Sequence, residues 1–186
     1  MPRGSCCSTS RRGQPPISGA KHGPARLRSY YAAHENHMDQ MRTDGFIGED
    51  TLVLEPIGAG LLTMVGEIAC LGGIVVEVEK YLEVLEGEAL DAYVRTFEYK
   101  YNAFVRGHNN ILRYDNSHAY AGHGDPHHKH VYDWKTGEPL PDFPAWVGER
   151  DWPTLGEVME ELRMWYWENR EDLPEPDGYP ELEQRG

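Results

Sequence analysis

The stretch Ile74–Leu85, with the sequence IVVEVEKYLEVL, shows the residue alternation of a β-strand. Its apolar side chains share one parity and its glutamates share the other, and side chains of opposite parity point to opposite faces of a sheet. Lys80 is the one charged residue at an apolar position. The alternation predicts a half-buried strand, with an apolar face made by Ile74, Val76, Val78, Leu82 and Val84 and a polar face made by Glu77, Glu79 and Glu83.

The residues that follow continue this strand into a β-meander. EGE at 86–88 predicts a turn, and the Tyr-rich segment 89–107 predicts one long strand or two strands with a bend near Thr96. GHNN at 107–110 is typical of a hairpin turn, because Gly and Asn tolerate positive φ, and ILRYD at 111–115 predicts the returning strand. We therefore expect an antiparallel meander of three or four strands, with one face made by Tyr93, Phe97, Tyr99, Tyr101 and Val105.

A helix is predicted near the C-terminus, in TLGEVMEELRMWYWENR at 154–170. Its apolar residues follow the i, i+3, i+4, i+7 spacing, Thr154 and Glu157 match a capping box, and Pro174 ends the segment. Three or four strands alone are only marginally stable, so we expect the helix to cover the sheet. The predicted fold class is α+β: a small antiparallel meander of three to four strands packed against one C-terminal amphipathic helix, with a disordered N-terminal extension.

The composition of residues 1–60 differs from that of the rest of the chain. They begin with a segment rich in Gly, Pro, Ser and Arg and without periodicity, which buries too little apolar surface to offset its ordering entropy. We interpret 1–60 as a disordered extension or as residues upstream of the true start codon, and His34 and His37 as solvated. Residues 61–173 are predicted to form one α+β domain, and residues 174–186 a flexible acidic tail.

The charge is unevenly distributed along the chain. The net charge is −13, yet residues 1–28 contain six basic side chains and no acid, while the residues from Met64 onward contain 25 acids and 11 bases. Such an acidic body repels phosphates and disfavours non-specific binding to nucleic acid or anionic lipid. The three cysteines form no disulfide framework, no apolar stretch is long enough to span a membrane, and the start lacks a secretory signal. These features predict a cytoplasmic protein.

The segment 111–134, ILRYDNSHAYAGHGDPHHKHVYDW, concentrates the residues that can do chemistry, and three interpretations of it stay open. In the first it binds a metal ion, because imidazole is a common ligand of transition metals. His123, His127 and His130 have a workable spacing for zinc. Pro126 breaks any helix here, however, and no cysteine pair is present.

In the second interpretation the segment is a metal-independent acid–base centre that acts on a phosphodiester. RNA cleavage by the 2′-hydroxyl needs a base, an acid and cations that stabilise the charge developing at phosphorus. Alternation in an extended segment places His128 and His130 on one side, so we expect these imidazoles to converge with the Arg113 guanidinium in one pocket. The candidate catalytic residues are His128 and His130 as base and acid, Arg113 and Lys129 as cations, and Asp115 as the group that orients a histidine.

In the third interpretation the histidines are solvated side chains or contacts to a partner protein. His108, in the predicted turn, is of this kind. Tyr99, Tyr101 and Tyr120 are interpreted as sheet packing rather than as platforms for nucleotide stacking.

Three segments, YKYNAFVRGHNNILRYDNSH, DPHHKHVYDW and PTLGEVMEELRMW, taken in this order, resemble the TumE family of toxin components of prokaryotic toxin–antitoxin systems. The resemblance spans about Ile68 to Arg170 and is most specific where RYDN is followed by PHHKH. The insertion HAYAGHGD between these motifs and the N-terminal extension depart from the family pattern, which leaves the distance from Asp115 to the histidines open. By position, the family motif falls on Arg113, Tyr114, Asp115 and Asn116, and on Pro126, His127, His128, Lys129 and His130.

The resemblance implies a small cytoplasmic toxin of a type II system that pairs with a helix-turn-helix DNA-binding antitoxin. Toxins of this size are often ribonucleases, which favours RNA as the substrate and no cofactor. The acidic body would slow the approach of RNA unless Arg106, Arg113 and Lys129 form a local positive patch. The alternative is a metal-binding or protein-interaction module without enzymatic activity, with zinc as the cofactor. Enzymatic activity and oligomeric state stay open.

Overall fold

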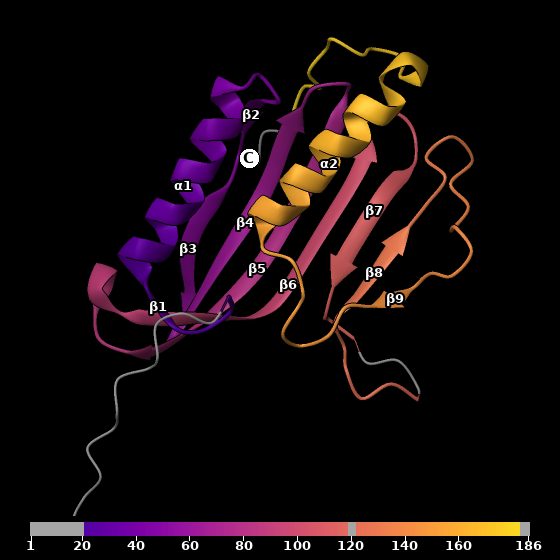
Figure 1. The fold of residues 1–186 in the computed structure, drawn as a ribbon. Helices are drawn as coiled ribbons and strands as arrows, with labels where there is room; N and C mark the ends of the chain where they lie inside the picture. The colour runs from indigo at the N-terminus through magenta and orange to yellow at the C-terminus, as the bar shows by residue number, and fades with distance from the viewer. Residues whose placement is uncertain (1–20, 119–121, 183–186) are drawn as a thin grey trace, which may run out of the picture.

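The structure, a computed structural model, describes residues 21–118 and 122–182. Its strands form one antiparallel sheet in the order β2-β4-β5-β6-β7-β8-β9, with β1 paired to β6 and β3 paired to β4 (Figure 1). The strands are β1 (Ala25–Arg26), β2 (Ile47–Asp50), β3 (Val53–Gly58), β4 (Leu61–Cys70), β5 (Ile74–Glu86), β6 (Tyr93–Val105), β7 (Asn110–Asp115), β8 (His128–Val131) and β9 (Ala145–Trp146). The helices are α1 (Leu27–Thr43) and α2 (Leu155–Asn169), with short 3-10 helices η1 (Ala89–Asp91) and η2 (Arg170–Asp172).

The predicted α+β class and the C-terminal helix are confirmed, whereas the predicted strand count is too small. The expected meander corresponds to β5, β6 and β7, which pair in sequence, although the first connection is longer than the predicted turn at 86–88 because it includes η1. The sheet continues beyond both edges of this meander, through β4 on one side and β8 on the other. A nine-stranded sheet therefore stands where three or four strands were predicted.

Strand β5 confirms the alternation from which its face was predicted. Ile74, Val76, Val78 and Leu82 are at most 2% exposed and belong to the core, while the glutamates between them are only half-buried. Lys80 follows the apolar parity, as its position requires, and is 7% exposed. A charged side chain therefore enters the interior of the protein on this face.

A β-bulge interrupts the pairing of β5 with β6. The register shifts by one residue between Thr96 and Glu98, which leaves Phe97 as the extra residue. A bulge reverses the parity of the residues before it, so Phe97 is 43% exposed although Tyr99 is buried. The predicted bend near Thr96 is confirmed, but the expected placement of Tyr93 and Phe97 on the face of Tyr99 is wrong.

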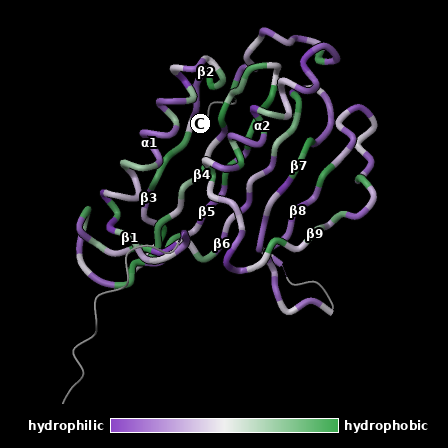
Figure 2. The backbone as a smooth tube through the Cα atoms, viewed as in Figure 1, coloured by the Kyte–Doolittle hydropathy of each residue, from purple (hydrophilic) through white to green (hydrophobic). Residues whose placement is uncertain are grey.

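Both α-helices lie on the same face of the sheet, α1 beside β3 and α2 above β5 and β6 (Figure 1). The predicted capping box is present: Thr154 Oγ1 accepts from the Glu157 backbone N–H, and the Glu157 carboxylate accepts from the Thr154 N–H. Figure 2 shows hydrophobic stretches interspersed with hydrophilic ones along the strands, as expected for a sheet with one buried face. The residues of α2 that pack on the sheet are Leu155, Val158, Met159, Leu162 and Tyr166.

The predicted disorder of residues 1–60 is wrong for the residues from 25 to 58, which form α1 and strands β1 to β3. Met38 and Met41 are 1% and 0% exposed and belong to the main core. Helix α1 buries only these two residues and Leu27, so its apolar pattern is too sparse to be read as a helical period. Residues 1–20 lie outside the described residues.

The expected flexibility of the tail also fails for the residues up to 182. The backbone N–H groups of Gly72 and Gly73 donate to the Gly178 carbonyl oxygen at 2.9 and 3.2 Å. Tyr179 donates to the Gly45 carbonyl oxygen, and its ring lies where a side chain at Gly48 would be. The segment after Pro174 is therefore held against the ends of β2 and β4. None of the described helices combines the length and apolar character needed to span a membrane.

Candidate functional site

The pairing of β7 with β8 brings the two predicted motifs together. Arg113 is the register partner of His130, and Asp115 is the register partner of His128. Opposed residues of an antiparallel pair point to the same face of the sheet. The expected convergence of the imidazoles with the Arg113 guanidinium is therefore observed.

These four residues lie on the face of the sheet opposite the helices. Their neighbours in the ladder, Tyr114 and Lys129, have the other parity, and both contact Glu161 of α2. The open face carries two rows of polar residues across the strands. One row is Glu79, Lys100, Asp115 and His128, and the other is Glu77, Asn102, Arg113 and His130.

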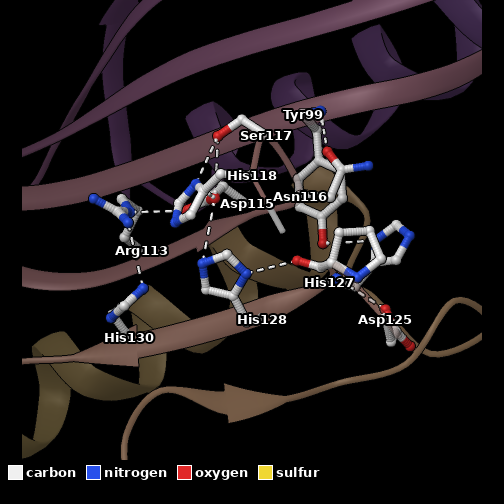
Figure 3. A network of polar contacts seen from close by, with 11 residues as sticks. Tyr99, Arg113, Asp115, Asn116, Ser117, His118, Asp125, His127, His128 and His130 are labelled. Carbon is white, nitrogen blue, oxygen red and sulfur yellow. Dashed lines mark hydrogen bonds and ion pairs between the residues drawn. The ribbon is translucent and has the colours of Figure 1, made fainter. Parts of the chain in front are cut away.

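Asp115 is the centre of the cluster, and it is 1% exposed (Figure 3). Its Oδ2 accepts a hydrogen bond from Arg113 Nε at 2.7 Å. Its Oδ1 lies 3.2 Å from Ser117 Oγ, 3.2 Å from His118 Nδ1 and 3.3 Å from His128 Nε2. A buried carboxylate needs such compensation, because desolvation without partners is costly. Asp115 therefore holds the surrounding side chains in a defined arrangement.

The His128 ring is wholly buried, and its orientation is determined by two contacts. Nδ1 lies 2.6 Å from the Pro126 carbonyl oxygen, which can only accept, so Nδ1 carries a proton and donates it. Nε2 then faces the Asp115 carboxylate. If Nε2 also carries a proton, the ring is an imidazolium paired with Asp115; if it does not, its lone pair points at a carboxylate oxygen. The second arrangement is favourable only with a cation between the two atoms.

His130 lies at the edge of the cluster and is partly exposed. Arg113 Nη2 lies 3.3 Å from its Nε2, and since a guanidinium only donates, Nε2 is the acceptor. Burial, followed by the positive charge of Arg113, lowers the pKa of His130 from 6.5 to about 4. His130 is therefore a neutral imidazole at neutral pH, with a lone pair directed at the guanidinium.

His118 belongs to the cluster, although the sequence reasoning left it out of the candidate catalytic set. Its ring lies edge-on to His128 with the centroids 4.9 Å apart, and the His130 ring lies at the same distance from His128. The His118 side chain is 46% exposed. The spacing of Asp115 and His118, three residues apart after the end of a strand, is the signal in the sequence that places both in one turn.

Lys129 is the candidate catalytic residue that the structure separates from the others. Its ammonium group pairs with Glu161 of α2 and lies 5.2 Å from the centre of the Tyr114 ring, on the helix-covered face. The assignment of Lys129 to phosphate stabilisation is therefore corrected. Arg106, Arg113 and Lys129 also do not form the local positive patch that would ease the approach of RNA, because Lys129 is on the other face and Arg106 pairs with Glu67.

The ligand set first considered for zinc does not assemble. His123 stacks on Trp146 with the ring centroids 3.5 Å apart, and His127 lies on the helix-covered face, with Nδ1 3.2 Å from the Tyr99 hydroxyl. Across the part of the chain that the structure describes, one group of three side chains has metal-ligand atoms within 4.8 Å of one another. It consists of Asp115, His128 and His130.

The protein is of the α+β class, with an antiparallel sheet that carries both helices on one face. The other face carries the Asp–His–Arg cluster, whose groups are suited to proton transfer or metal binding. Residues 66–151, which include strands β5 to β9, match the model of the family described as Toxin TumE. The resemblance inferred from RYDN and PHHKH is thereby confirmed, although α1 and α2 lie outside the matched residues. The match indicates the role of a toxin. No curated protein and no solved structure matches the chain significantly.

Proposed function

We propose that this protein is the toxin of a type II toxin–antitoxin system and that it cleaves RNA without a metal ion. The family supplies the toxin role. The observation that carries the chemistry is the contact of Arg113 Nη2 with His130 Nε2 at 3.3 Å, beside the Asp115 carboxylate. A guanidinium holds a phosphate and stabilises developing negative charge, and an adjacent imidazole transfers a proton.

The proposed reaction transfers two protons. A base takes the proton of the 2′-hydroxyl, whose oxygen attacks the neighbouring phosphorus, and an acid protonates the departing 5′-oxygen, which leaves a 2′,3′-cyclic phosphate. We assign the base to His130, because its low pKa keeps its ring neutral and able to accept a proton at pH 7. When an RNA phosphate binds Arg113, the guanidinium turns from His130 Nε2 to the phosphate and frees the lone pair.

The exposure of the imidazoles suggests which of them touch the substrate. The His118 side chain is nearly half exposed, and its ring lies against His128, as does the ring of His130, so we assign the acid to His118. His128 has a side-chain exposure of 0%, which keeps it from contact with RNA. Its role in the proposal, together with Asp115, is to position the two outer rings.

The position of Arg113 supports a mechanism without a metal ion. Its Nε and Nη2 already occupy lone pairs of Asp115 and His130, and its positive charge repels a divalent cation at the same place. The guanidinium supplies the charge stabilisation that a metal ion supplies in other nucleases.

Zinc binding is a second candidate function, because a specific observation favours it. The hydrogen bond from His128 Nδ1 to the Pro126 carbonyl is the arrangement that orients metal-ligating histidines, and it turns Nε2 toward Asp115. Asp115, His128 and His130 would be the protein ligands, in place of the set with His123 and His127. This function would make the protein a metal-binding or interaction module rather than an enzyme.

The proposed partner is a DNA-binding antitoxin with a helix-turn-helix domain. A DNA-binding protein carries positive charge, and the net charge of −13 of this chain favours association with such a partner in the cytoplasm. The acidic surface also limits binding of RNA to the vicinity of Arg113. Strong salt dependence of the complex is the expected consequence.

Incubation of the purified protein with RNA, in EDTA and in added zinc, distinguishes the two functions. Cleavage in EDTA to products with 2′,3′-cyclic phosphate ends supports the proposed ribonuclease, and an RNA with 2′-O-methyl groups serves as the uncleavable control. Absence of cleavage in both conditions refutes it. Stoichiometric zinc in the purified protein, lost in Asp115→Asn, establishes the second candidate instead.

A further inference from the structure

Lys80 is a buried cation on the face of the sheet opposite to the histidine cluster. Its side chain projects from β5 toward α1, where Nζ donates to the Tyr30 hydroxyl and lies 4.7 Å from the centre of the Tyr30 ring. The residue is 7% exposed, and no described carboxylate lies within ion-pair distance of its ammonium group. A buried ammonium group without an anion is unfavourable, which suggests that an anion is bound here.

Two adjoining hollows surround Lys80, with volumes of about 420 and 370 Å³. Lys21, Ser29, Tyr30 and Thr154 line both of them, as does Lys80 itself. The described residues that line the hollows include four Lys or Arg and three His, and none is Asp or Glu. The whole chain has a net charge of −13, so a hollow that is lined by basic side chains and by no described acid differs strongly in charge from the rest of the protein.

The other cations of these walls already have carboxylate partners. Lys21 pairs with Glu157, Arg26 with Asp91, and Arg95 with Glu83. The Glu157 carboxylate pairs with Lys21 and also accepts a hydrogen bond from the backbone N–H of Thr154, the N-cap of α2. Lys80 is therefore the Lys or Arg side chain of these walls that has no carboxylate partner among the described residues.

Histidines and a helix terminus add further donors. His34 and His37 of α1 line the smaller hollow, together with Leu155 and Gly156 in the first turn of α2. The N-terminus of a helix favours negative charge. The His37 Nε2 atom is buried and has no hydrogen-bond partner among the described residues. Burial and the charge of Lys80 lower the pKa of His34 to about 4, as expected where the potential is positive.

We propose that this hollow binds a small phosphate-bearing molecule, a nucleoside monophosphate in the first instance. The phosphate would lie between Lys80, the donors of α1 and the first turn of α2. Tyr30 lines both hollows and offers an aromatic ring to a base, whereas the Trp152 ring is already stacked between His22 and Tyr99. The volumes are in the range of small-molecule sites.

The site is independent of the proposed ribonuclease centre. Lys80 and Asp115 have opposite parity relative to the sheet, so the β-sheet itself separates the two sites. A ligand in the hollow contacts α1, the start of α2 and the N-terminal part of β6, and none of the residues of the histidine cluster. Failure of one proposal leaves the other unaffected.

Calorimetric titration with adenosine monophosphate, inorganic phosphate and adenosine tests the proposal. We expect the monophosphate to bind, inorganic phosphate to bind more weakly, and adenosine to bind weakest. Lys80→Met retains the length of the side chain and removes its charge, and it should weaken binding of the monophosphate by about tenfold or more. Lys135→Met removes an exposed lysine that pairs with Asp172, and it should leave binding unchanged.

Three results overturn the proposal: no binding of either phosphate compound, equal affinity of Lys80→Met and the unaltered protein, or adenosine binding as tightly as its monophosphate. Far-UV circular dichroism establishes that Lys80→Met is folded. If that variant is not folded, NMR of the histidine ring protons in the unaltered protein tests the site instead. Titration with the monophosphate should shift those of His34 and His37, and binding that leaves both unchanged also refutes the site.

Discussion

Arg113 and His130 face each other across two neighbouring strands, with guanidinium Nη2 3.3 Å from imidazole Nε2. Neither side chain is near the other in the sequence, and the register of β7 with β8 creates the contact. Burial and the charge of the guanidinium keep the imidazole neutral, and the guanidinium is itself held by Asp115. The proposed chemistry depends on this arrangement, and so do the three predictions for His130 below.

His130→Ala should reduce RNA cleavage by about two orders of magnitude or more and relieve growth inhibition, because it removes the proposed base. His130 is partly exposed, so the fold should be retained. His108→Ala serves as the control, since His108 lies in the hairpin turn against Trp134. Undiminished toxicity of the first variant would contradict the proposed role of His130.

The ring of His130 should titrate with a midpoint near 4, which NMR of the histidine ring protons measures. Burial is the largest cause and the charges of Arg113 and His128 follow, while Asp115 acts in the opposite direction. Arg113→Met should therefore raise the midpoint part of the way to 6.5. A midpoint at or above 6.5 in the unaltered protein would show that the guanidinium does not face the ring.

This lowered pKa also determines how His130 affects stability. The folded state binds the proton less tightly than the unfolded state, so unfolding takes up a proton between about pH 6.5 and 4. The contribution to stability is complete above this window and is lost as the pH falls through it. Chemical denaturation should show a smaller loss of stability on acidification in His130→Asn than in the unaltered protein.

Lys129→Met should leave RNA cleavage unchanged, because Lys129 lies on the face of the sheet away from the histidine cluster. Loss of the ion pair with Glu161 should lower the free energy of unfolding by no more than about 1 kcal/mol, since the pair is partly exposed. Cleavage rates and denaturation of the same preparation measure both quantities. A loss of RNA cleavage as large as that caused by His130→Ala would show that the reaction requires Lys129, contrary to this assignment.

Met41→Ala should destabilise the protein by about 2–5 kcal/mol, because it removes a fully buried side chain of α1 and leaves a cavity. Met164→Ala, on the exposed side of α2 at 64% exposure, should change stability by less than about 0.5 kcal/mol. Thermal or urea denaturation of the two variants measures the difference. Equal stabilities would mean that residues 25–58 are not part of the core.

Local patterns predicted those elements whose own side chains specify them. The alternation of Ile74–Leu85 predicts β5, and the spacing of Thr154 and Glu157 predicts the start of α2, because periodicity and capping are properties of neighbouring residues. Helix α1 was not predicted, because its three buried residues, Leu27, Met38 and Met41, are too few to show a helical period. Its position depends on packing against the sheet, which a local pattern does not show.

The sequence by itself determined the meander, the C-terminal helix, the family and the residue types of the site. It also indicated that His128 and His130 share a side of one strand, because parity along a strand is a local property. Only the tertiary structure decided that Arg113 meets His130, that His118 joins the cluster and that Lys129 leaves it. Strands β7 and β8 are separated in the sequence by a long loop, and backbone hydrogen bonds between them set their register. No side-chain pattern within either strand specifies that register.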